Sequence, residues 1–275
     1  MTEFFEALLA HAFLSRAFVV GLAVSLCAAL LGVSLVLKRV SMIGDGLSHV
    51  GFGAVALGLA LGWAPMAVSV PVVLVAAWWL LRLSETAKIK GDAAIAVVST
   101  GALAIGIIVV SMTTGVNLDV HSYMFGSLLA IQKSDVPVSL ALAAVVLVLY
   151  GVFYLKLFSV TFDEGFARAS GLRVGAYNLL LALLTGVTIV LGMRLMGALL
   201  VSAIILFPPL SAMRLFRSFR GAVLGAAVIA TICFVVGMML SYAYSTPVGA
   251  GVVAVNLVVF GICCVGGRFL RRAAG

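Results

Sequence analysis

The sequence has 275 residues, of which 64% are hydrophobic and only 9% are charged. Soluble domains carry about 25% charged residues, so this composition excludes an ordinary soluble enzyme or binding domain and indicates one polytopic membrane domain, residues 1–275. The formal net charge is +8, but the basic residues are scattered between apolar stretches, which argues against a nucleic-acid-binding surface and favours a role in membrane topology.

Nine apolar stretches approach the length of a membrane-spanning helix, which is about 20 residues for a hydrocarbon core of about 30 Å. We therefore expect an all-α bundle of nine spans in the lipid bilayer, or eight if one short stretch fails to cross. In chain order the stretches are residues 14–37, 42–62, 65–82, 91–112, 136–156, 174–193, 196–214, 221–243 and 247–267. Pro208 and Pro209 fall in the seventh stretch, where we expect them to bend or break the helix.

The basic residues predict the orientation of these spans. With the N-terminus outside, 14 of the 17 Lys and Arg residues fall in segments that face the cytoplasm, and 3 fall outside. Cytoplasmic loops are enriched in Lys and Arg, so nine crossings with the N-terminus outside and the C-terminus in the cytoplasm are favoured. The acidic start of the chain is unlike a cleavable signal peptide, so we expect the first span to be retained.

Asp45 and His49 lie one helical turn apart in the second stretch. Residues four apart share a face of a helix, so this carboxylate and this imidazole are directed to the same region. Ionisable groups at membrane depth usually mark a pathway or a site, and an oxygen and nitrogen ligand pair suits Zn²⁺ or Mn²⁺. The alternative from the residues alone is a structural pair, in which Asp45 orients His49 or caps the helix.

One chain provides too few ligands for a closed metal site, because no third acidic residue or histidine falls on a nearby span. A two-fold homodimer with this helix at its axis would supply two Asp and two His, enough for a tetrahedral site. Small residues around the pair permit close helix approach, between two copies or equally within one chain. They are Gly44, Gly46, Ser48, Gly51, Gly53 and Gly58.

Two connections are long enough to have structure of their own. Residues 113–135 contain Asp119 and His121, which we expect to lie in a solvated outer loop, with a part in cation entry as the alternative. Residues 157–173 should face the cytoplasm. There, Thr161 and Glu164 have the spacing of a capping box, and Gly171 fits a helix C-terminus, so the sequence predicts a short cytoplasmic helix over residues 161–171.

Charge and apolar residues in this segment support an amphipathic helix. Asp163 and Glu164 complement the positive end of the helix dipole, and Arg168 complements the negative end. Phe162 and Phe166 are four residues apart and would form one apolar stripe. Such a helix either rests on lipid headgroups or docks on a cytoplasmic partner protein.

Catalytic motifs are weak in this chain. It contains no His-Glu-x-x-His zinc signature and no Gly-x-x-x-x-Gly-Lys-Ser/Thr phosphate loop, so it cannot hydrolyse ATP by that route. Active transport would therefore need a partner ATPase or an ion gradient. An intramembrane enzyme is the third hypothesis, but Ser48 beside His49 points about 100° away from it and is poorly placed for proton transfer.

Three segments in chain order resemble the permease subunit of ATP-binding-cassette importers for zinc and manganese. The first is residues 39–49, which contain Asp45 and His49 and match the family's Gly-Asp-Ala-Leu-Ser-His segment except for glycine at position 46. The second is residues 91–96. The third is residues 162–171, followed by the span that reaches residues 194–201 and Pro208.

This resemblance implies a homodimeric permease in the bacterial inner membrane that imports Zn²⁺, or as second candidate Mn²⁺, with no permanently bound cofactor. It implies two partners, a cytoplasmic ATP-binding-cassette ATPase and an extracytoplasmic metal-binding protein. Asp45 and His49 match the positions that coordinate the ion. Residues that would dock on the ATPase are Phe162, Asp163, Glu164, Phe166 and Arg168. An ion-gradient-driven metal carrier without an ATPase is the alternative function.

Overall fold

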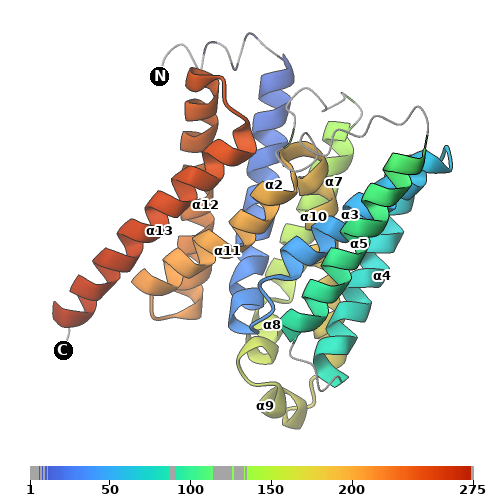
Figure 1. Cartoon of the computed structure of the whole chain (residues 1–275). Helices are drawn as coiled ribbons and strands as arrows, with labels where there is room; N and C mark the ends of the chain where they lie inside the picture. Colours follow the sequence, from blue (N-terminus) through green and yellow to red (C-terminus); the bar gives the residue numbers. More distant parts are fainter. Residues whose placement is uncertain are drawn as a thin grey trace.

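The computed structural model describes residues 12–86, 91–113 and 135–273, together with Glu6, Leu8, Ala10, Gly126 and Lys133. All regular structure in these residues is helical, as expected (Figure 1). The helices are α2 (Ala12–Leu37), α3 (Ile43–Ala60), α4 (Pro65–Thr86), α5 (Gly91–Met112), α7 (Asp135–Val152), α8 (Tyr154–Phe162), α9 (Glu164–Ala169), α10 (Val174–Met196), α11 (Ala198–Leu215), α12 (Phe219–Tyr244) and α13 (Val248–Ala273).

Seven described helices are long and apolar enough to cross a bilayer, namely α2, α3, α5, α10, α11, α12 and α13. The pair α7 and α8 would make an eighth span if it crosses as one bent unit. The remaining expected span, the third in chain order (residues 65–82), corresponds to α4, which contains Pro71 and whose apolar part is shorter, Ala67–Leu80. The nine apolar stretches therefore all contain helices, but by length and composition seven or eight of them qualify as spans.

The long helices run in alternating directions through the bundle (Figure 1). In that view α2 begins at the upper end, and α13 ends at the lower end. The short helices α8 and α9 also lie at the lower end, close to the turn that joins α2 to α3. The start of α2 and the end of α13 therefore lie at opposite ends of the bundle.

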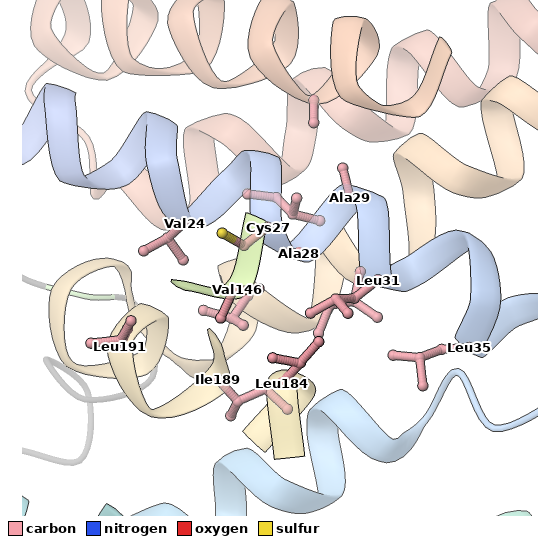
Figure 2. Close-up of a cluster of buried hydrophobic side chains, with 14 of the residues drawn as sticks. Val24, Cys27, Ala28, Ala29, Leu31, Leu35, Val146, Leu184, Ile189 and Leu191 are labelled. Atoms are coloured by element: carbon pink, nitrogen blue, oxygen red, sulfur yellow. The ribbon is translucent and has the colours of Figure 1, made fainter. Parts of the chain in front are cut away.

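Helix α2 forms the centre of the bundle because it is apolar on all sides, which is the pattern of a buried helix. It contacts α7, α10, α11 and α12. Figure 2 shows its buried side chains meeting Val146 of α7 and several residues of α10. The labelled members of this cluster are Val24, Cys27, Ala28, Ala29, Leu31, Leu35, Val146, Leu184, Ile189 and Leu191.

Of the two outcomes expected at Pro208 and Pro209, a bend or a break, the break is absent, because α11 continues through both prolines to Leu215. Proline lacks an N–H, so Pro209 leaves the Ile205 carbonyl without its usual helical donor. That carbonyl lies against Gly32 of α2, so closely that a Cβ on Gly32 would overlap the oxygen. The absence of a side chain at Gly32 therefore permits the central helix to pack closely on the freed backbone of α11.

A bend that the sequence did not indicate lies between α7 and α8. The two helices meet at 68°, and the break falls at Phe153, which has φ −94° and ψ 9°. The Nζ atom of Lys156 lies 5.6 Å from the Phe153 ring centroid and 5.7 Å from that of Tyr177 on α10. These contacts hold the first turn of α8 against α10. The expected span over residues 136–156 therefore corresponds to a bent pair of helices.

Candidate metal site

Two glycines set the orientation of α3 around Asp45. A Cβ on Gly44 would lie 3.0 Å from Cδ1 of Ile205, so this side of α3 packs on α11. A Cβ on Gly46 would lie 2.6 Å from Cγ2 of Ile95, so the other side packs on α5. Because residues before and after Asp45 are about 100° away on either side, these contacts leave Asp45 on the side of α3 that neither helix covers.

Two further glycines of α3 also pack against other helices of the same chain. A Cβ on Gly53 would lie 2.8 Å from the Ala102 carbonyl oxygen of α5, and one on Gly58 would lie 3.3 Å from Cα of Pro65 at the start of α4. The sequence left open whether these small residues serve packing between copies or within one chain. For Gly44, Gly46, Gly53 and Gly58 the contacts are within the chain, so they give no support to a dimer.

Asp45 and His49 lie together on the uncovered side of α3. The Asp45 side chain is 44% exposed and that of His49 is 16% exposed, whereas Leu47 on the opposite side of the helix and Ser48, about 100° around the helix from His49, are fully buried. The His49 Nε2 atom lies 3.6 Å from Oδ2 of Asp45. Asp45 belongs to the first turn of α3, where the helix dipole favours a carboxylate. Both groups are therefore accessible from the same side.

Among the described residues, no group of three or more His, Cys, Asp or Glu side chains is placed to hold a metal ion. Asp45 and His49 thus form a pair without a third ligand of these types in that part of the chain. The two residues considered for metal entry, Asp119 and His121, lie outside the described residues. A closed site needs further ligands from beyond this arrangement.

Ser48 does not combine with His49 into a catalytic pair. Its hydroxyl donates to the Gly44 carbonyl at 2.8 Å, and the side chain is fully buried. His49 points to the uncovered side of α3 instead. The arrangement therefore suits ligation of a cation rather than activation of a serine nucleophile.

The predicted cytoplasmic helix is shorter than residues 161–171. Helix α8 ends at Phe162, Asp163 is extended with φ −149° and ψ 100°, and α9 covers only Glu164–Ala169. The capping box is also wrong, because Asp163 and not Thr161 is the N-cap. The Asp163 carboxylate accepts a hydrogen bond from the Phe166 backbone N–H at 2.9 Å. The N-cap lies two residues later than the sequence predicts, because Thr161 is still part of α8 and is buried there.

The C-terminal end of α9 agrees with the sequence prediction. Gly171 has φ +82°, its N–H donates to the Arg168 carbonyl, and the N–H of Leu172 donates to the Ala167 carbonyl. These two bonds form a Schellman motif, which needs a left-handed residue and so favours glycine.

Phe162 and Phe166 do not form one stripe of a single helix, because the break at Asp163 separates them. Both are nevertheless exposed, at 60% and 66%. The Phe162 ring also packs against Phe158 and Phe219, with centroids 4.9 Å and 5.9 Å away. Two large apolar side chains therefore project from this end of the bundle, one from the end of α8 and one from α9.

Glu164 connects α9 to the bundle through contacts that the sequence did not reveal. Its Oε1 atom accepts a hydrogen bond from Lys38 Nζ at 2.5 Å and another from Asn178 Nδ2 at 3.1 Å. Partial burial acts to raise the Glu164 pKa, but the bonds from Lys38 and Asn178 and the charges of Lys38 and Arg168 outweigh it and hold the pKa below its ordinary value. The ionised Glu164 carboxylate therefore connects α9 to Lys38 and Asn178, in addition to complementing the dipole of α9.

Comparison with known proteins identifies the family of this chain. Residues 10–266 match the model of the ABC 3 transport family. A manganese transport system membrane protein, MntC of Halalkalibacterium halodurans, is 28% identical over 95% of this chain and 90% of its own length. The high-affinity zinc uptake system membrane protein ZnuB of Haemophilus influenzae is 29% identical over 89% of this chain and 94% of its own length.

Solved structures show the same fold. The PsaBC complex from Streptococcus pneumoniae, solved with a Fab, contains a chain with a TM-score of 0.84 and 27% identity, covering 95% of this chain and 94% of that one. An inward-facing putative metal-chelate type ABC transporter has a TM-score of 0.74 at 14% identity. The chain therefore belongs to the ABC 3 transport family and is a membrane permease of the manganese and zinc transporter type, a transport protein and not an enzyme.

Proposed function

We propose that two copies of this chain form the membrane pathway of an ATP-driven importer of Zn²⁺ or Mn²⁺, and that Asp45 and His49 of each copy are the ligands. The observation that carries this proposal is the position of the pair on the uncovered side of α3. A half-exposed carboxylate and a partly buried imidazole lie together there, within a segment long and apolar enough to cross a bilayer. Ionisable groups in such segments usually serve transport.

The separation of the two groups suits ligation of one ion. Metal bonds of about 2.1 Å in a tetrahedral site place neighbouring ligand atoms about 3.4 Å apart. Nε2 of His49 and Oδ2 of Asp45 are 3.6 Å apart, so both can reach one ion with little movement. A second copy around a two-fold axis would complete four ligands. Zn²⁺ is the first candidate for this ligand set, and Mn²⁺, the ion named in several relatives, is the second.

The energy source in this proposal is a cytoplasmic ATPase bound at α9, with an extracytoplasmic protein delivering the ion. Lys and Arg enrichment on the side of α9 supports a cytoplasmic position and an N-terminus outside the bacterial inner membrane. Exposed Phe162 and Phe166 would enter an apolar groove on the ATPase. Asp163 caps α9, and Arg168 lies in its last turn. An ion-gradient carrier is the second candidate, but it leaves the two exposed phenylalanines without a role.

The test is metal uptake into liposomes that contain this chain with its ATPase and binding protein. Asp45→Asn and His49→Gln preserve shape and remove one ligand each, so both variants should lose ATP-dependent uptake of ⁶⁵Zn²⁺ and ⁵⁴Mn²⁺ while the complex still assembles. Ser48→Ala is the matched control, because it lies between the two ligands on the buried side of α3.

Wild-type uptake in Asp45→Asn and His49→Gln would refute the assignment of the ligands. Gradient-driven uptake by liposomes that contain only this chain would instead favour the carrier. The two ions are compared in the same preparation, so the experiment also decides between zinc and manganese.

A further inference from the structure

Helix α9 is too short to hold its position by itself. It has six residues, and isolated helices shorter than about 12 residues are marginal in water. Its place in the fold therefore depends on tertiary contacts. Ala167 supplies one of them, since it is fully buried against Val160 of α8 and Val174 of α10. The polar contact is the Glu164 carboxylate.

This carboxylate joins three separate elements. Lys38 immediately follows the last residue of α2, the central helix, and its side chain is only 11% exposed. Asn178 lies in α10 and is 2% exposed. Both donate to the same oxygen of Glu164, at 2.5 Å and 3.1 Å. Charge-assisted hydrogen bonds of this kind are about twice as strong as neutral ones. The Glu164 carboxylate therefore links α9 to the end of α2 and to the first turns of α10.

The turn that follows Lys38 leads directly to the candidate metal ligands. The N–H of Arg39 donates to the Val36 carbonyl, and the N–H of Val40 donates to the Leu35 carbonyl. Arg39 is left-handed with φ +59°, so the turn is a Schellman motif with a strained residue at its centre. The N–H of Ile43 then donates to the Val40 carbonyl, and α3 begins. This hydrogen-bonded turn has little freedom to absorb a displacement of Lys38.

We infer that Glu164 is a positioning residue that fixes α9 to Lys38 and Asn178, so that movement imposed on α9 reaches the start of α3 and the Asp45 carboxylate. The inference rests on the proposed function, because it assumes that an ATPase docks at α9. Phe162 and Phe166 supply the contact with the partner in this scheme. Glu164, whose carboxylate is turned to the bundle, transmits the movement without contacting the ion.

The test separates ATP hydrolysis from metal uptake in the same reconstituted complex. Glu164→Gln keeps the shape and removes the charge, and Lys38→Gln removes the other half of the ion pair. In both variants hydrolysis should stay near the wild-type rate, while metal transported per ATP falls about fivefold, the size expected for one charge-assisted hydrogen bond at a partly exposed site. The swapped double variant Lys38→Glu/Glu164→Lys should regain most of the lost ratio.

Arg173→Gln is the control for charge. Arg173 is an exposed cation directly before α10 whose side chain does not cap the helix, so this variant should keep the wild-type ratio. The inference would be overturned if Glu164→Gln transported as much metal per ATP as the wild type, or if hydrolysis and uptake fell equally in the single variants. It would also be overturned if the swapped double variant transported no more metal per ATP than the single variants. If the wild-type complex itself showed no ATP-dependent uptake, the proposed function would be refuted instead.

Discussion

Gly53 lies where α3 touches the backbone of α5, and we predict that Gly53→Ala destabilises the bundle. The new Cβ would lie 2.8 Å from the Ala102 carbonyl oxygen, whereas ordinary contact begins at 3.4 Å, so the helices must separate by about 0.6 Å. Overpacking costs about 1–3 kcal/mol, and replacing glycine by alanine in a helix returns about 0.8–1.0 kcal/mol. A net loss of about 1 kcal/mol lowers Tm by about 2–4 °C for a chain of this size.

The control is Gly101→Ala, one residue before Ala102 on the same helix. A Cβ there meets nothing within 4 Å, so the variant keeps the gain in helix propensity without the steric cost and should raise Tm by about 2–4 °C. Tm is measured by circular dichroism at 222 nm on the purified chain in detergent. A Tm for Gly53→Ala equal to or above that of the wild type would refute the close approach of α3 and α5.

Two further predictions concern α9 and use hydrogen-exchange protection of its backbone amides. Because the folded-state pKa of Glu164 is below its ordinary value, its stabilising contribution is present above the ordinary glutamate pKa and is lost as pH falls through the folded-state value. Hydrogen-exchange protection of α9 should therefore decrease in the wild type when the pH is lowered below about 4.3, but not in Glu164→Gln. The same dependence of protection on pH in both proteins would contradict the role of Lys38. Gly171→Ala should reduce this protection about tenfold, because an L-residue costs about 1–2 kcal/mol at a left-handed position. Gly171→Asn should reduce protection less than Gly171→Ala. Equal reductions in the two variants would argue against backbone strain as the cause.

Most helix positions could be predicted from apolar length alone. Residues 91–112 were expected to form a span and coincide with α5, and residues 174–193 lie within α10. The features that could not be predicted are those that depend on contacts between helices. The backbone of α11 beside Pro209 packs on Gly32 of α2, which is distant in sequence. The bend at Phe153 has no nearby proline in the sequence that would predict it.

The same division applies to the candidate site. The four-residue spacing of Asp45 and His49 was enough to predict that they share a helix face, since the geometry of a helix fixes it. The side of α3 that stays uncovered could not be predicted, because Gly44 and Gly46 had to be placed against α11 and α5 first. Glu164 was expected at α9, but its partner Lys38 is 126 residues away in sequence, and no local pattern indicates such a pair.

The most direct test of the proposed metal site is anomalous diffraction from crystals of the complex grown with Mn²⁺ or Zn²⁺. The account predicts one anomalous peak for each pair of chains, on the two-fold axis, within bonding distance of Asp45 and His49 of both copies. The peak should disappear in crystals of His49→Gln grown in the same way. A peak in the wild type that lies away from these side chains, or one that persists unchanged in His49→Gln, would contradict the account.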